Sequence, residues 1–122
     1  MNHILIVDDE AEIRESLGEI LKEDGYTVTT TATASEALIL LRDASYDVML
    51  LDIGLPDMDG YEVAREMRAS PELANIRLVA LTGYGQAEDK QRARSAGFDD
   101  HLVKPVEFPA LQRVLAGLKN RR

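Results

Sequence analysis

Val48-Met49-Leu50-Leu51-Asp52 is the stretch that decides the fold, because four consecutive apolar residues end in a carboxylate. An apolar run this short, followed by turn formers at 53–57, is typical of a strand buried on both faces in a parallel sheet. Ligands of such sheets bind beyond the carboxyl ends of the strands. Asp52 lies at that end, so we interpret it as the reactive centre of the molecule.

Further strands and helices are predicted around this strand. Short apolar or β-branched runs predict strands at residues 3–7, 26–31, 76–82 and 99–103. Apolar residues at helical spacing, together with capping residues, predict helices near residues 13–24, 33–43, 59–69, 86–96 and 111–118. Strand and helix therefore alternate five times. This order predicts an α/β fold, one domain over residues 1–122 with a parallel sheet and helices on both faces.

Composition narrows the possible functions. The chain of 122 residues has no cysteine and a net charge of -8. The lack of cysteine excludes disulfides and thiolate metal sites, and the acidic charge argues against direct binding to nucleic acid. No apolar stretch approaches the roughly 20 residues that a membrane helix needs. The N-terminus also lacks the features of a signal peptide, so we expect a cytoplasmic protein with no membrane partner.

Polar residues follow four of the predicted strands. Asp8 and Asp9 come after the first strand, Asp52 ends the third, Thr82 ends the fourth and Lys104 follows the fifth. All these ends lie at one edge of a doubly wound sheet. Three carboxylates placed together repel one another, and Mg²⁺ would relieve that repulsion because it favours carboxylate oxygens and waters. A carboxylate nucleophile beside Mg²⁺, a hydroxyl and an ammonium suits phosphoryl transfer.

Each of these residues also has an ordinary structural interpretation. Asp8 and Asp9 could be helix N-caps, since Asp is a favoured capping residue. Thr82 could start a turn, Lys104 could be a solvated surface charge, and Asp52 could be a cap or turn residue. The joint placement of these side chains at strand ends favours the functional interpretation.

With these residues in place, the chain resembles the receiver domain of two-component response regulators over essentially its whole length. The resemblance rests on four motifs in this order and spacing: Val7-Asp8-Asp9-Glu10, Leu51-Asp52 with Leu55-Pro56-Asp57-Met58-Asp59-Gly60, Ala80-Leu81-Thr82-Gly83, and Val103-Lys104-Pro105. It implies a flavodoxin-like sheet with strand order 2-1-3-4-5.

The resemblance also implies how the acidic residues act. Asp52 is similar to the residue that accepts a phosphoryl group from a phosphohistidine of a sensor histidine kinase or histidine phosphotransfer protein. Asp9, Asp52 and the carbonyl of Gly54 resemble the direct Mg²⁺ ligands, and Asp8 resembles a ligand that acts through water. Such a domain is a phosphorylation-controlled switch rather than an enzyme, and it occurs alone or within a larger regulator or hybrid kinase.

Further roles follow from the same resemblance. Thr82 is similar to the switch hydroxyl, Lys104 to the ion-pair partner of the phosphoryl group, and Lys104-Pro105 to a cis peptide. The family usually carries Tyr or Phe where this chain has His101, which is either a partial substitute for that switch or a surface histidine on an edge strand. Independently of the resemblance, Tyr84 is bulky and lies two residues after Thr82, so it is expected to shield the phosphoryl group in part.

The output surface is expected on the fourth helix, the fifth strand and the fifth helix, and its partner is unknown. The fourth helix has only alanines to pack inward, so it should be the least firmly anchored of the helices.

Two other classes of α/β protein fit the sequence less well, because each needs residues that this chain lacks. A phosphatase of the haloacid dehalogenase type has a second Asp two residues after its nucleophile, where this chain has Gly54. A flavodoxin needs a hydroxyl-rich phosphate loop after the first strand, where this chain has Asp8-Asp9-Glu10. A flavodoxin would be yellow when purified, and a phosphatase would turn over a chromogenic phosphate ester.

Overall fold

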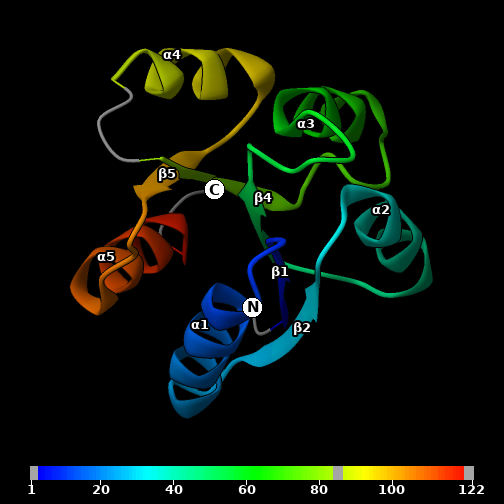
Figure 1. Cartoon of the computed structure of the whole chain (residues 1–122). Coiled ribbons are helices and arrows are strands. Elements are labelled where there is room, and N and C mark those ends of the chain that lie inside the picture. The colour runs from blue at the N-terminus through cyan, green and yellow to red at the C-terminus, as the bar shows by residue number, and fades with distance from the viewer. Residues whose placement is uncertain (1–2, 84–86, 120–122) are drawn as a thin grey trace.

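The computed structural model describes residues 3–83 and 87–119, except for the side chains of residues 87–90. Strands and helices alternate along this part of the chain (Figure 1). Their bounds are β1 His3–Val7, α1 Ala11–Glu23, β2 Thr27–Thr31, α2 Ala34–Asp43, β3 Val48–Asp52, α3 Gly60–Ala69, β4 Arg77–Thr82, α4 Ala87–Ala96, β5 Asp100–Val103 and α5 Phe108–Lys119. Among the described residues, no helix is long and apolar enough to cross a bilayer.

The strands form one parallel sheet in the order β2-β1-β3-β4-β5, which confirms the flavodoxin-like, doubly wound fold. The register places Asp52 beside Leu81 of β4, and Thr82 beside Val103 of β5. Because the strands are parallel and in register, the residues that follow them gather at one edge of the sheet.

The unbroken apolar run of β3 follows from its central position. Met49 and Leu51 pack into a core beneath α2, α3 and α4, whereas Val48 and Leu50 pack into a second core beneath α1 and α5. Figure 1 shows these two sets of helices on opposite faces of the sheet. Every residue of β3 is buried. Because both faces of this strand are covered, its sequence does not alternate between apolar and polar residues.

Local signals explain most of the helix ends. Thr33 caps α2 by accepting a hydrogen bond from the Glu36 N–H, and Gly25 follows α1 with a φ of 95°, a conformation that suits glycine. The strands β2, β4 and β5 begin one residue later than predicted. The N–H groups of Tyr26 and Ile76 bond to carbonyls of the preceding helix or turn, at 3.0 and 3.2 Å, so these two residues are buried without joining the strands.

The C-terminal end of α4 is tied down by Arg68 of α3. Its Nε donates to the Gly97 carbonyl at 2.8 Å, and its Nη2 donates to Asp99 Oδ2 at 2.9 Å. Its Nη1 bonds two carbonyls of the loop before β4, each at 2.8 Å. Gly97 has a φ of 113°, and a Cβ there would lie 2.6 Å from Arg68 Cγ. One guanidinium therefore joins α3, α4 and the start of β5.

Candidate functional site

Three carboxylates meet at the carboxyl edge of the sheet, as predicted. One oxygen each from Asp8, Asp9 and Asp52 lies within 4.8 Å of the other two. Asp8 is 0% exposed and Asp52 is 7% exposed, whereas Asp9 is exposed to solvent. The cluster therefore has a buried floor and one open side. The N-cap of α1 is Glu10, which forms no side-chain capping bond, so the interpretation of Asp8 and Asp9 as N-caps is wrong.

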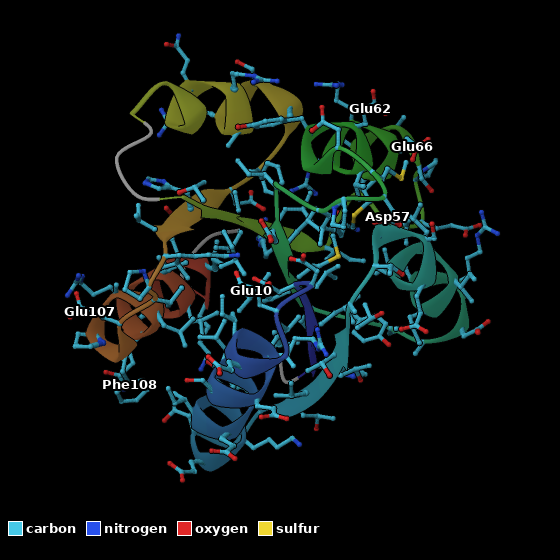
Figure 2. The ribbon with its side chains drawn as sticks, viewed as in Figure 1. Glu10, Asp57, Glu62, Glu66, Glu107 and Phe108 are labelled. Atoms are coloured by element: carbon cyan, nitrogen blue, oxygen red, sulfur yellow. The ribbon has the colours of Figure 1, made fainter. Side chains whose placement is uncertain are left out.

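Lys104 brings the balancing charge into the cluster. Its Nζ lies 2.8 Å from Asp8 Oδ2, 3.0 Å from Asp52 Oδ2 and 3.6 Å from Glu10 Oε1. Figure 2 shows Glu10 at the start of α1, beside the end of β1. The Lys104 N–H donates to the Thr82 carbonyl at 2.9 Å, which fixes the residue after β5, and the Lys104-Pro105 peptide is cis as the resemblance implied.

Burial and charge shift the pKa values of this pair. Burial raises the pKa of the Asp8 carboxyl, and the opposing effects of Lys104 and of the Glu10 N–H do not cancel it. Burial acts to lower the pKa of Lys104, but its interactions with Asp8 and Asp52 outweigh burial and raise that pKa overall. The ammonium is therefore retained at neutral pH, where it screens the carboxylates from one another.

The donor set suits a hard divalent cation. The oxygens of the three aspartates are the ligand type that Mg²⁺ prefers, and the one ammonium leaves the group with an excess of negative charge. Gly54 also lies against the site, because its N–H donates to Asp52 Oδ1 at 2.8 Å. A Cβ on Gly54 would lie 3.5 Å from that oxygen, so a side chain there would stand beside Asp52 without clashing with it.

Thr82 reaches the same edge, but its hydroxyl is engaged elsewhere. The buried Thr82 Oγ1 donates to the Leu102 carbonyl of β5 at 3.4 Å. This distance is well beyond the typical 2.7–2.8 Å of an O–H···O hydrogen bond, so the bond is weak. The structure thus places the hydroxyl near the cluster in an arrangement that costs little to leave.

The remaining predicted residues are less tightly placed. The side chain of His101 is 28% exposed on β5, with its Nδ1 3.7 Å from Asp100 Oδ1. Pro105 is exposed. Tyr84 lies outside the described residues, so its shielding role stays a prediction. Among the described side chains of α4, Ala93 and Ala96 are the buried ones, in keeping with its expected shallow packing.

Sequence reasoning missed two residues that support the site. Arg14 Nη1 donates to the Asp8 carbonyl at 2.7 Å and so holds the end of β1 to α1. Asp57 accepts hydrogen bonds from the N–H groups of Ala34 at 3.2 Å and Ser35 at 3.1 Å, so the loop after β3 is tied to the start of α2 (Figure 2). No hydrophobic periodicity or capping pattern in the sequence predicts the contact of Arg14 with Asp8 or the contacts of Asp57 with α2.

Comparison with known proteins agrees with this geometry. The sequence matches the family model of the response regulator receiver domain over residues 4–116. The two-component response regulator PhoP of Pseudomonas aeruginosa is 36% identical over 118 residues, which cover 97% of this chain and 52% of PhoP. The chain therefore spans about half the length of that relative.

Two solved structures are also similar. The chemotaxis response regulator CheY4 of Vibrio cholerae superposes with a TM-score of 0.89 and 31% identity, over 97% of this chain and 98% of that one. The co-crystal structure of the Saccharomyces cerevisiae histidine phosphotransfer protein Ypd1 and the receiver domain of its response regulator Ssk1 gives a TM-score of 0.84 and 26% identity, covering 94% and 86% of the two chains.

The substitution Lys104→Met tests the charge balance of the cluster. Because it leaves Asp8 and Asp52 without their cation, we expect the free energy of unfolding in Mg²⁺-free buffer to fall by about 2 kcal/mol. Mg²⁺ should then stabilise the variant more than the wild type, since it no longer competes with the ammonium for these carboxylates. Urea unfolding followed by circular dichroism, with and without Mg²⁺, measures both effects. Lys22→Met is the exposed control, and equal Mg²⁺ stabilisation in variant and wild type would contradict the competition.

The substitution Asp57→Asn tests the tie between the loop and α2. Desolvation acts to raise the pKa of the Asp57 carboxyl, but hydrogen bonds from Ser35 and Ala34 hold it below the ordinary value of 3.8. Its stabilising contribution is therefore present above pH 3.8 and is lost as pH falls through the lowered pKa. We expect the variant to lose about 1 kcal/mol at pH 6, because one of the two carboxylate oxygens that accept N–H groups becomes an amide NH₂, which cannot accept them. This deficit should shrink as the pH falls below 3.8.

Urea titrations of wild type and variant at several pH values measure this difference. Asp43→Asn is the matched control, because it removes the same charge at the opposite end of α2, where a carboxylate opposes the helix dipole. A deficit of Asp57→Asn that did not vary with pH would show that the charge of Asp57 plays no part.

Proposed function

The chain belongs to the response regulator receiver domain family, and we propose that it is a phosphoacceptor switch in a two-component phosphorelay. In this proposal, Asp52 takes a phosphoryl group from a phosphohistidine and the resulting aspartyl phosphate changes the affinity of the domain for an output partner. The observation that carries the proposal is the convergence of Asp8, Asp9, Asp52 and Lys104 at one sheet edge.

Asp52 is positioned as the nucleophile. Its Oδ1 accepts the Gly54 N–H and its Oδ2 pairs with Lys104, so the carboxylate is held in one orientation. In the transfer step, an oxygen of Asp52 forms a bond to phosphorus as the bond between phosphorus and the imidazole nitrogen of the donor breaks. The electron pair of the broken bond stays on the imidazole, which the solvent protonates.

Mg²⁺, held by Asp9 and Asp52 with Asp8 beside them, supplies positive charge to the phosphoryl oxygens when it is bound. Lys104 already lies 3.0 Å from Asp52, so its ammonium can pair with a phosphoryl oxygen once Asp52 is esterified. The ammonium of Lys104, which pairs with Asp8 and Asp52 in the free protein, would then pair with the phosphoryl group. In this proposal the domain assists only its own phosphorylation and dephosphorylation, and it is not otherwise an enzyme.

Thr82 and α4 form the proposed switch. The long bond from the Thr82 hydroxyl to Leu102 gives way when a phosphoryl oxygen offers a stronger acceptor nearby. Because Thr82 ends β4, which leads toward α4, its movement is passed to the helix with the shallowest apolar contacts.

The proposed output surface consists of α4, β5 and the start of α5. Val103 of β5 is 38% exposed and Phe108 at the start of α5 is 40% exposed, so two large apolar side chains of these elements reach solvent. The proposed donors are a sensor histidine kinase or a histidine phosphotransfer protein, a class supported by the similarity to the Ssk1–Ypd1 structure. The output partner has no assigned identity, and direct binding to nucleic acid is not proposed.

The substitution Asp52→Asn tests the phosphoacceptor. We expect incubation of the wild type with acetyl phosphate and Mg²⁺ to add one phosphoryl group, seen in the intact mass, and we expect the variant to remain unmodified. Asp43→Asn is the matched control, since it changes an exposed aspartate at the end of α2, outside the carboxylate cluster, and should leave phosphorylation intact. Full phosphorylation of Asp52→Asn would disprove the assignment.

Amide hydrogen exchange tests the output surface. Beryllofluoride, a mimic of the phosphoryl group, should change protection in residues 87–102, which cover α4 and most of β5, and should change α2 much less. Addition of fluoride and Mg²⁺ without beryllium controls for the ions. Changes confined to the neighbourhood of Asp52 and Gly54 would show that the signal leaves by another route.

A further inference from the structure

The face of α3 that points toward α4 carries arginines. Tyr61, Arg65 and Arg68 are spaced i, i+4 and i+7, so they share one stripe of the helix. Glu62 and Glu66 occupy the next stripe, and both are labelled on α3 in Figure 2. Glu66 lines the separate groove between α2 and α3. Glu66 is thus directed toward α2, whereas Arg65 and Arg68 lie on the side of α3 that faces α4.

A pocket of about 370 Å³ lies between α3 and α4. Its lining residues are Tyr61, Arg65, Gln91, Arg92, Ser95 and Ala96. Two guanidinium groups, an amide and a hydroxyl can donate hydrogen bonds into this space, and among the described residues none that lines the pocket is acidic. In a chain with a net charge of -8, these lining residues form a local concentration of positive charge and of donors.

Arg92 is held in place by an aromatic ring. Its Cζ lies 4.2 Å from the centre of the Tyr61 ring, and that ring in turn packs edge-on against Phe98, with centroids 6.4 Å apart. Tyr61 is only 5% exposed, whereas Arg92 is exposed to solvent. The ring therefore orients the guanidinium and leaves its N–H groups available, since a ring face accepts the charge without using up the donors.

Arg65 and Arg92 differ from Arg68 in the partners that the described residues give them. Arg68 is occupied by three carbonyls and by Asp99. In the part of the chain that the structure describes, neither Arg65 nor Arg92 forms an ion pair with a carboxylate. The two guanidiniums lie on different helices and line the same pocket.

We propose that the pocket between α3 and α4 binds a small phosphorylated ligand, with Arg65 and Arg92 on its phosphate group and Gln91 and Ser95 as further donors. A tetrahedral phosphate offers oxygens in several directions, which suits donors that approach from two helices, whereas a carboxylate offers two oxygens in one plane. The volume of about 370 Å³ lies within the range of small-ligand pockets, roughly 300–1,000 Å³. This site is separate from the carboxylate cluster and does not depend on the chemistry of Asp52.

The experiment is a titration of the Mg²⁺-free, ¹⁵N-labelled protein with inorganic phosphate, followed by NMR at an ionic strength held constant with chloride. We expect saturable shifts in the amides of residues 61–65 and 91–96. Arg65→Gln and Arg92→Gln should each weaken binding at least tenfold. Arg94→Gln is the matched control, because Arg94 is exposed on α4 but does not line the pocket.

Several outcomes would overturn the proposal. Wild-type affinity in Arg65→Gln and Arg92→Gln would exclude these residues as ligands. An equal response to acetate would show that the pocket does not select phosphate, and shifts confined to Lys104 and its neighbours would place the anion at the carboxylate cluster. Arg65→Gln keeps the test decisive even if Arg92→Gln loosens α4, because Arg65 takes no part in the contact between Arg92 and Tyr61.

Discussion

The ion pairs of Lys104 with Asp8 and Asp52 are the interaction on which the functional end of the molecule depends. Three carboxylates within 4.8 Å of one another, one of them fully buried, would repel one another strongly without a nearby cation. The Lys104 ammonium lies 2.8 Å from Asp8 and 3.0 Å from Asp52, and its positive charge reduces the repulsion among the carboxylates. The compensation is incomplete, and the remaining negative charge suits the site to a divalent cation.

The sheet makes this unfavourable cluster possible. Asp52 is carried by a strand whose residues are all buried, and two cores hold that strand from opposite faces. The apolar burial on both sides far exceeds the cost of one crowded edge, because fully burying a single large apolar side chain contributes roughly 1.5–3 kcal/mol. The same burial leaves the backbone beneath Asp52 little freedom, so in the proposed switch the movement would fall to the connections and to α4.

The position of the strands and the residues that follow them could be predicted from the sequence, because each signal is local. A short apolar run that ends in a polar residue places that residue at the sheet edge once the strands are known to be parallel. The contacts of Arg14 with the Asp8 carbonyl, of Asp57 with α2 and of Arg92 with Tyr61 could not be predicted, because their partners are fixed by packing. The direction of the Thr82 hydroxyl likewise depends on a neighbouring strand.

Arg68 determines what kind of motion α4 can undergo. Its bonds to the Gly97 carbonyl and to Asp99 fix the C-terminal end of the helix, and no side chain fits between Arg68 and Gly97. A helix fixed at one end moves as a lever about that end, so its displacement grows along its length. Over ten residues, about 15 Å, a tilt of roughly 10° carries the far end through about 2.6 Å. Arg68 thus fixes the point about which α4 would rotate in the proposed switch, and a small rotation at that point would displace the opposite end of the helix by more.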